Sequence, residues 1–260
     1  MPMHPDFSAV KAVFFDLDDT LCAYWEAARA ALYETFEKFR FEGYLPQDML
    51  KFWSREFGLY CPGLKKTEWY APYLKRGEPS RTELMRRALA LAGVNDDHLA
   101  REVSDFYAGR RGELLKLFED ATPAIEALKG KYFLGMITNG PADVQRGEVV
   151  NLGLEAHFQS ILIEGELGFG KPNPEIFRLA ERESACKPQE ILFIGNSYAH
   201  DVLPAIHAGW RAVWVQRASD EPPTRSGEGA RPEDLPEGLP EPDMTVKELA
   251  PVVSALLGTG

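Results

Sequence analysis

The sequence is poor in cysteine and has no long apolar run, and each shortage excludes a class of protein. Its three cysteines are Cys22, Cys61 and Cys186. They are odd in number and widely spaced, so they predict neither a disulfide framework nor a metal site. No apolar stretch approaches the roughly 20 residues that a helix needs to span a bilayer, and the N-terminal residues do not follow the pattern of a signal peptide. We therefore expect a cytoplasmic protein without a membrane partner.

Basic side chains are also fewer than acidic ones. The chain has 29 Lys and Arg against 40 Asp and Glu, which gives a formal net charge of −11. Nucleic-acid phosphates and anionic lipids repel such a chain, so we expect no nucleic-acid partner, although one local site can still bind a small anion. The 260 residues, 45% of them hydrophobic, suffice for one large domain or a domain with a sizeable insertion. The sequence leaves the oligomeric state open.

Five short runs of apolar, β-forming residues are present: Lys11–Asp16, Tyr132–Thr138, Ser160–Ile163, Ile191–Gly195 and Arg211–Val215. They are nearly continuous rather than alternating, which is typical of a parallel sheet covered on both faces. Helices are predicted between them, with start signals at Thr122 and Asn173, each followed by proline, and another helix over residues 198–208. The alternation indicates an α/β fold with a doubly wound parallel sheet.

More than a hundred residues separate the first two runs, far more than a crossover needs. The residues between these runs show helical periodicity. They predict a separate helical domain over 23–117, inserted into a core formed by 1–22 and 118–260. Its aromatic residues are expected mostly in its core, with a few lining a pocket. Its arginines are expected on solvated helix faces: Arg86, Arg87, Arg110 and Arg111. Residues 219–243, rich in Pro, Gly and charge, predict a mobile surface loop, and residues 245–257 predict a final helix.

Polar residues follow four of the runs, at the strand ends where open α/β sheets bind ligands. They are Asp16, Asp18, Asp19 and Thr20, then Thr138, Asn139 and Gly140, then Lys171, and last Asn196, Ser197, His200 and Asp201. Acids, a hydroxyl, a lysine and backbone amides together favour a site for a hydrated divalent cation and a phosphate.

Four segments in this order resemble the motifs of the haloacid dehalogenase-like (HAD) hydrolase superfamily: "DLDDT", "TNG", "GKPNPEIF" and "GNSYAHDV". The insertion after the first motif resembles the helical C1 cap of this family, and the second motif resembles its phosphatase branch. The resemblance implies a HAD-type Rossmann-like core and a Mg²⁺-dependent phosphatase for small phosphomonoesters of the nucleotide or sugar phosphate type.

The resemblance also implies a role for each motif residue. Asp16 would be the nucleophile that forms an aspartyl-phosphate, and Asp18 the general acid and then base. Thr138 and Lys171 would stabilise the transferring phosphoryl group, with Asn139 and Gly140 binding the substrate. The implied magnesium ligands are the Asp16 side chain, the Asp18 backbone carbonyl, Asp201 and Asn196. Thr20 is expected to support the motif loop by a hydrogen bond.

One position departs from the family pattern. The fourth motif usually begins with Gly-Asp, whereas Asn196 follows Gly195 here. An amide oxygen binds magnesium weakly and without charge, so Asp201 is expected to bind the metal directly or through water. Three alternatives remain at this point: a phosphomutase, a 2-haloacid dehalogenase of the same fold, or a non-catalytic binding module, the last supported by Asn196 alone.

Overall fold

Six parallel strands form a single sheet in the computed structural model, which describes residues 5–224, 235 and 237–259. Their order across the sheet is β3-β2-β1-β4-β5-β6. The strands are β1 (Ala12–Phe15), β2 (Phe133–Thr138), β3 (Ser160–Ile163), β4 (Ile191–Gly195), β5 (Arg211–Val215) and β6 (Met244–Val246). The predicted α/β fold with a parallel sheet is therefore confirmed.

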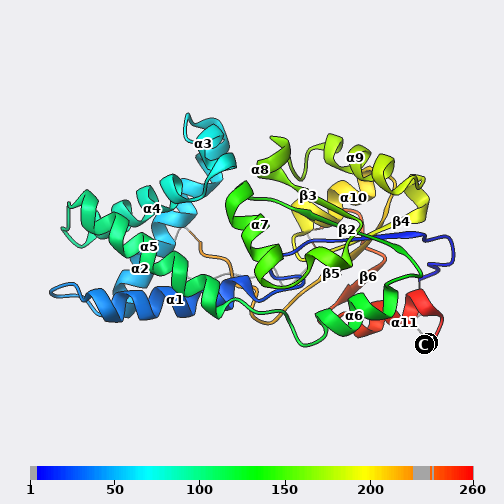
Figure 1. Cartoon of the computed structure of the whole chain (residues 1–260), viewed down its shortest axis with the longest axis horizontal. Coiled ribbons are helices and arrows are strands. Elements are labelled where there is room, and N and C mark those ends of the chain that lie inside the picture. Colours follow the sequence, from blue (N-terminus) through cyan, green and yellow to red (C-terminus); the bar gives the residue numbers. More distant parts are fainter. Residues whose placement is uncertain (1–4, 225–234, 236, 260) are drawn as a thin grey trace.

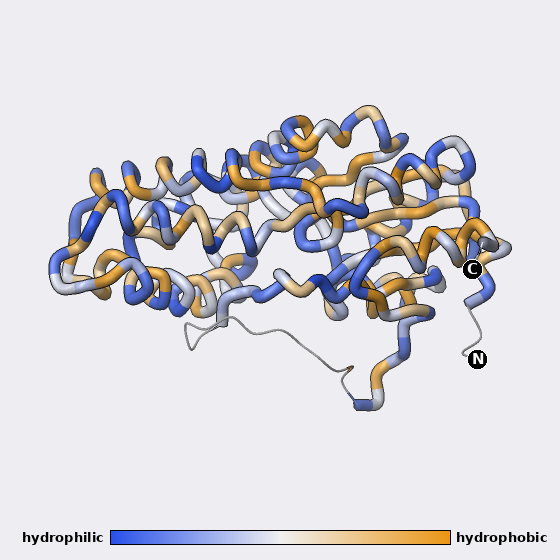
Figure 2. Tube along the Cα trace, turned by 90° about the horizontal axis from the view of Figure 1, so that it is seen from below, coloured by the Kyte–Doolittle hydropathy of each residue, from blue (hydrophilic) through white to orange (hydrophobic). Residues whose placement is uncertain are grey.

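Helices cover both faces of the sheet (Figure 1). One side has α6 (Ala121–Leu128), α7 (Ala142–Asn151) and α11 (Ala250–Leu257); the other has α9 (Pro174–Ser184) and α10 (Leu203–His207). Val13 and Phe15 of β1 point into the first hydrophobic cluster, and Ala12 and Phe14 into the second. Because both faces are buried, every residue of this strand is apolar. Figure 2 shows hydrophobic stretches along the strands inside the core.

The insertion between β1 and β2 is helical throughout, as predicted. It contains α1 (Tyr24–Phe39), α2 (Pro46–Tyr60), a 3-10 segment (Cys61–Lys66), α3 (Tyr70–Lys75), α4 (Glu78–Leu91) and α5 (Asp97–Leu114). These helices pack around their own hydrophobic cluster, which includes Trp53, Met85 and Tyr107. They stand to one side of the sheet and form the cap (Figure 1). The predicted C1-type cap is confirmed.

Helix boundaries are set by tertiary contacts as well as by local signals. Asn173 accepts a hydrogen bond from the Glu175 amide at 3.0 Å and caps α9 as predicted. The prediction of Thr122 as a cap is wrong, because α6 already begins at Ala121, after Asp120. The Asp120 carboxylate is occupied elsewhere, by the Arg217 guanidinium and the Leu249 amide.

The C-terminal segment is not one helix. Residues 244–246 form strand β6 on the edge of β5, and α11 begins only at Ala250. Asp243 fixes the start of this strand, since its carboxylate accepts hydrogen bonds from Arg211 at 2.6 Å and from the Ala212 amide at 2.9 Å. Three residues are too few for a periodicity that sequence analysis could detect.

Within residues 219–243, the part 225–234 and residue 236 lie outside the described residues, so the prediction of a mobile loop is not tested there. Residues 219–221 pack against the cap, because Arg29 of α1 donates to the carbonyls of Ser219 at 3.0 Å and Glu221 at 3.1 Å.

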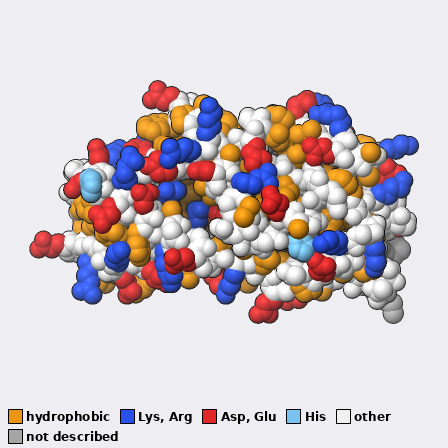
Figure 3. All heavy atoms as spheres, viewed as in Figure 1, with side chains coloured by type: hydrophobic (Ala, Val, Ile, Leu, Met, Phe, Trp, Pro, Cys, Tyr) orange, Lys and Arg blue, Asp and Glu red, His pale blue; other side chains and the backbone are white. Residues whose placement is uncertain are grey.

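Among the described residues, no helix is both long and apolar enough to cross a bilayer. Acidic and basic side chains are interspersed over the face shown in Figure 3.

Candidate active site

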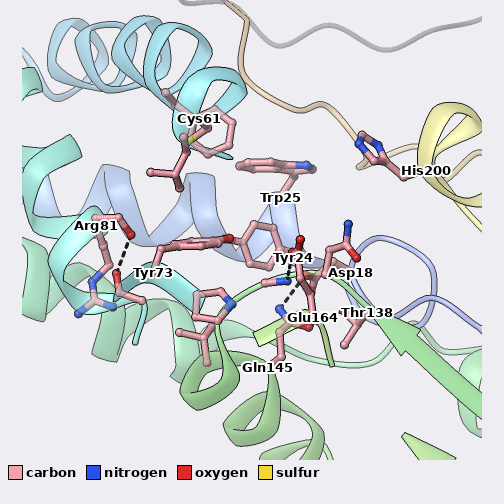
Figure 4. A pocket seen from close by; sticks show the side chains of 18 of the residues that line it. Asp18, Tyr24, Trp25, Cys61, Tyr73, Arg81, Thr138, Gln145, Glu164 and His200 are labelled. Atoms are coloured by element: carbon pink, nitrogen blue, oxygen red, sulfur yellow. Dashed lines mark hydrogen bonds between the residues drawn. The ribbon is translucent and has the colours of Figure 1, made fainter. Parts of the chain in front are cut away.

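A cavity of about 490 Å³ lies between the carboxyl ends of the strands and the cap helices. All eight residues predicted for the site line it: Asp16, Asp18, Thr138, Asn139, Gly140, Lys171, Asn196 and Asp201. Figure 4 shows Asp18, Thr138 and Gln145 on one side of this cavity, with Tyr24, Trp25 and Tyr73 of the cap near them. Residues up to 185 positions apart in the sequence, from Asp16 to Asp201, thus surround one volume.

Asp16, Lys171 and Asp201 form a buried charged cluster beneath the cavity. The Lys171 ammonium donates to Asp16 Oδ1 and to Asp201 Oδ1, both at 2.6 Å. The Asp16 amide continues the sheet by donating to the Ile194 carbonyl on β4, and Thr20 donates its hydroxyl to Asp16 Oδ2. Burial raises the pKa of Asp16 to about 6; Lys171 opposes this shift and Asp201 adds to it.

Asp18 is held by a side chain that the sequence analysis did not identify. Gln145 of α7 donates through Nε2 to Asp18 Oδ2 at 3.1 Å and to Glu148 Oε2 at 3.2 Å. Its Oε1 accepts the Thr138 hydroxyl at 2.5 Å. Burial raises the pKa of Asp18 well above its usual value, and the charges of Glu148 and Asp16 raise it further. A carboxyl group with a raised pKa is suited to donate a proton near neutral pH.

Arg111 corrects the prediction that the cap arginines lie on solvated faces. Its guanidinium is buried, and donates to Glu148 Oε1 at 3.0 Å and to the Tyr24 hydroxyl at 3.1 Å. This contact joins cap helix α5 to core helix α7 directly behind Asp18. Its neighbour Arg110 fits the prediction better, since it binds Glu34 and Glu113 at the surface.

The second motif holds in place the loop that carries Lys171. Asn139 donates through Nδ2 to the Lys171 carbonyl at 2.7 Å and accepts from the Lys171 amide at 2.8 Å. The Gly140 amide donates to Glu164 Oε2 at 3.1 Å. Glu164 also accepts hydrogen bonds from Lys65 and Tyr70 of the cap, each at 2.7 Å. Glu164 thus connects the predicted substrate-binding loop to the cap.

Asp19 and Asn196 lie at the edge of the site. Asp19 adopts a left-handed backbone conformation with φ 55°, and its carboxylate accepts from the Trp25 amide. Burial raises the pKa of Asp19 to about 9, with the charges of Asp220 and Asp18 adding to the shift. Asn196 donates through Nδ2 to Asp220 Oδ2 at 2.8 Å. Neither Asp220 nor its place beside the fourth motif follows from the sequence pattern.

The cap contributes an aromatic wall to the cavity. Its lining residues are Tyr24, Trp25, Trp53, Phe57, Tyr60, Tyr70, Tyr73 and Tyr107. His200 faces the cavity from the core side (Figure 4), and burial and the Lys171 charge lower its pKa, so the imidazole is neutral at pH 7. The aromatic residues of the insertion therefore serve both its core and the pocket, as expected.

Comparison with known proteins places these observations in a family. The model of the haloacid dehalogenase-like hydrolases matches residues 10–209. A phosphoserine phosphatase from Thermus thermophilus is 33% identical over 95% of this chain and 99% of its own length. An N-acylneuraminate-9-phosphatase from Rattus norvegicus is 25% identical over 84% of this chain and 88% of its own length.

Solved structures share the whole architecture. The HAD-hydrolase YfnB from Bacillus subtilis, bound to magnesium, superposes with a TM-score of 0.69 at 22% identity, covering 95% of this chain and 98% of that one. A 2-haloacid dehalogenase from Pseudomonas syringae gives a TM-score of 0.60 at 27% identity, covering 96% of this chain and 100% of that one. On the strength of the family model, which spans most of the sheet domain and the whole insertion, this chain belongs to the haloacid dehalogenase-like hydrolases.

Proposed function

We propose that the protein is a magnesium-dependent phosphatase that hydrolyses small phosphomonoesters through an aspartyl-phosphate on Asp16. The phosphatase class itself is confirmed, because relatives that are 25–33% identical over most of the chain are phosphatases. The observation that carries the mechanism is the arrangement of two carboxyl groups at one cavity. Asp16 is paired with the Lys171 ammonium, which opposes the rise of its pKa, while burial and the charges of Glu148 and Asp16 raise the pKa of Asp18 well above its usual value.

The residues present fit a magnesium ion. Asp16, Asp18 and Asp201 all line the cavity, and Lys171 is the cation paired with two of them. A divalent cation would offset this excess of negative charge. Within the described ranges, no three His, Cys, Asp or Glu side chains form a metal cluster by themselves. The ion would therefore be held by Asp16, the Asp18 carbonyl, Asp201 and Asn196 together with phosphate oxygens and water, since magnesium retains several waters.

The proposed reaction assigns one step to each carboxyl group. Asp16 attacks phosphorus while Lys171 shields the charge of the attacking oxygen and of the phosphoryl group. Asp18 protonates the leaving oxygen, and as a carboxylate it then deprotonates the water that hydrolyses the aspartyl-phosphate. The Thr138 hydroxyl, now donated to Gln145, can turn to a phosphoryl oxygen. The bound magnesium would supply charge neutralisation for the phosphoryl oxygens.

The cap would select the leaving group. We propose that residues 23–117 form this domain and that 1–22 and 118–260 form the catalytic core, in keeping with the separate hydrophobic cluster of the insertion. Its aromatic wall encloses the cavity and would exclude bulk water during attack. The cavity has room for a leaving group of the size of a sugar or an amino acid.

Phosphate release from a panel of metabolites tests this function. The panel includes phosphoserine, sugar phosphates and nucleoside monophosphates, each with Mg²⁺, Mn²⁺ or Co²⁺. We expect metal-dependent turnover of at least one compound and its loss in Asp16→Asn. Phosphate transferred to a second sugar would indicate a phosphomutase, and halide release from a 2-haloacid without metal would indicate a dehalogenase. No turnover in either protein with any metal would favour the binding module.

A further inference from the structure

Asn196 is oriented by a carboxylate from outside the four motifs. Its amide Nδ2 lies 2.8 Å from Asp220 Oδ2, and its backbone carbonyl accepts from Trp214 Nε1 at 2.8 Å. An ionised carboxylate can only accept hydrogen bonds, so the amide must present its NH₂ group to Asp220. Its oxygen is then the amide atom left for the cavity that Asn196 lines. The contact therefore determines which atom of Asn196 is available to a cation.

Asp220 is held in this position by the cap. Arg29 of α1 donates one hydrogen bond to the carbonyl of Ser219 and another to the carbonyl of Glu221, at 3.0 and 3.1 Å. One guanidinium therefore holds the residues on both sides of Asp220. The Asp220 amide adds a bond to the Arg217 carbonyl at 3.3 Å. These contacts fix the backbone that presents the Asp220 carboxylate to Asn196.

We propose that Asp220 is a positioning residue for the magnesium site, one that orients the Asn196 amide and supplies the negative charge that asparagine lacks. A carboxylate that accepts from an amide NH₂ polarises it and increases the negative charge on the amide oxygen. The Asn196–Asp220 pair thus takes the place of the acid that usually begins the fourth motif. This inference rests on the proposed magnesium dependence, but the residues that carry it lie partly on the cap and in the segment after β5.

Calorimetric titration of the full-length protein with Mg²⁺, without substrate, tests the role of Asp220. We expect Asp220→Asn to raise the dissociation constant of Mg²⁺ about tenfold, the size of effect found for partners of metal ligands. Glu221→Gln is the matched control. It removes the same charge from the next residue in the chain, whose side chain faces Arg29. It should leave the constant within about twofold. Asp220→Asn and Glu221→Gln giving equal constants would overturn the proposal.

A second background gives a change of opposite sign. In Asn196→Asp the two carboxylates face each other and repel, so adding Asp220→Asn should tighten Mg²⁺ binding or leave it unchanged. The same weakening in both backgrounds would contradict a role through Asn196. Arg29→Met frees residues 219–221 without altering a residue of the magnesium site, so it should weaken Mg²⁺ binding less than Asp220→Asn does. If Asp220→Asn does not fold, Arg29→Met provides the test. Wild-type protein that binds no Mg²⁺ would instead overturn the proposed metal dependence itself.

Discussion

At the scale of single residues, the two aspartates of the first motif lie in different surroundings that suit different tasks. Asp16 touches the Lys171 ammonium, which limits the rise of its pKa to about 6 and so favours the ionised form that the proposed mechanism needs at pH 7. Asp18 touches the neutral Gln145 amide, and Glu148 lies behind it, so burial and like charge favour its protonated form. Two groups separated by one residue are thereby pushed toward nucleophile and acid, a division found at many sites where paired carboxyl groups share a reaction.

Asp18→Asn tests this division of labour. The asparagine has the same shape but cannot donate a proton, so turnover of an alkyl phosphate should fall about 10²–10⁴-fold. A nitrophenyl phosphate has a leaving group that needs no proton, so its first turnover should be nearly as fast as in wild type. Rapid-mixing measurement of nitrophenol release would then show a burst followed by slow turnover. Equal losses for the first turnover of both substrates would contradict a role as acid.

At the scale of elements, α5 of the cap and α7 of the core meet through a buried ion pair. Arg111→Met leaves Glu148 buried without its cation, and we expect the free energy of unfolding to fall by about 3–5 kcal/mol. Arg110→Met on the same helix breaks only surface pairs and should cost at most about 1 kcal/mol. Urea unfolding measures both, and equal effects would show that the Arg111–Glu148 contact is not significant in solution. Arg111→Met with Glu148→Gln should recover part of the loss.

The start of α6 carries a pH-dependent contact. Partial burial acts to raise the pKa of Asp120, but hydrogen bonds from Arg217 and the Leu249 amide outweigh it, so its pKa is lowered. A lowered pKa stabilises the fold fully above the unfolded value of about 3.9, and this contribution is lost as the pH falls from there through the lower pKa of the folded state. Asp120→Asn should therefore cost about 2 kcal/mol at pH 7, less than a fully buried pair. Thermal unfolding should show that this difference shrinks as the pH falls below about 3.9, and a difference that stays constant would contradict the account.

Elements could be predicted from the sequence where the signal is local. The five apolar runs and the Asn173 cap depend on neighbouring residues, and the structure contains them. Strand β6 depends on the free edge of β5 and on Asp243, which no local pattern reports. Gln145 and Arg111 are likewise polar residues on helices, and their partners are distant in sequence. The folding of the core brings Gln145 to Asp18, and the docking of the cap on the core brings Arg111 to Glu148.

At the scale of the whole molecule, the cap and the core meet at several contacts next to the cavity. Gly77 of the cap donates its amide to Asp143 Oδ1 at 3.0 Å, and Lys65 and Tyr70 reach Glu164. The four motif sites could be predicted because they lie at strand ends in every fold of this type. The hydrogen bonds between cap and core, which we call closure contacts, could not be predicted, since they depend on where the cap rests on the core.

Asp143→Ala removes one closure contact without altering a motif residue. A single hydrogen bond stabilises a structure by about 1 kcal/mol, so the equilibrium constant for seating the cap on the core, as observed here, should fall about fivefold. We expect KM to rise by about that factor with a smaller change in kcat. Asp143→Asn, which keeps an acceptor oxygen, should remain near wild type, and an equal rise in KM for both variants would argue against this contact.

Covalent capture of the phosphoryl group on the enzyme tests the central claim most directly. In Asp18→Asn the aspartyl-phosphate should form but hydrolyse slowly, because no base activates the water. Acid quenching after mixing with nitrophenyl phosphate and Mg²⁺, followed by mass spectrometry of the peptides, should find one phosphoryl group on Asp16 and none when Asp16→Asn is added. Phosphate on another residue, or an unmodified Asp16 while nitrophenol is released, would contradict the account.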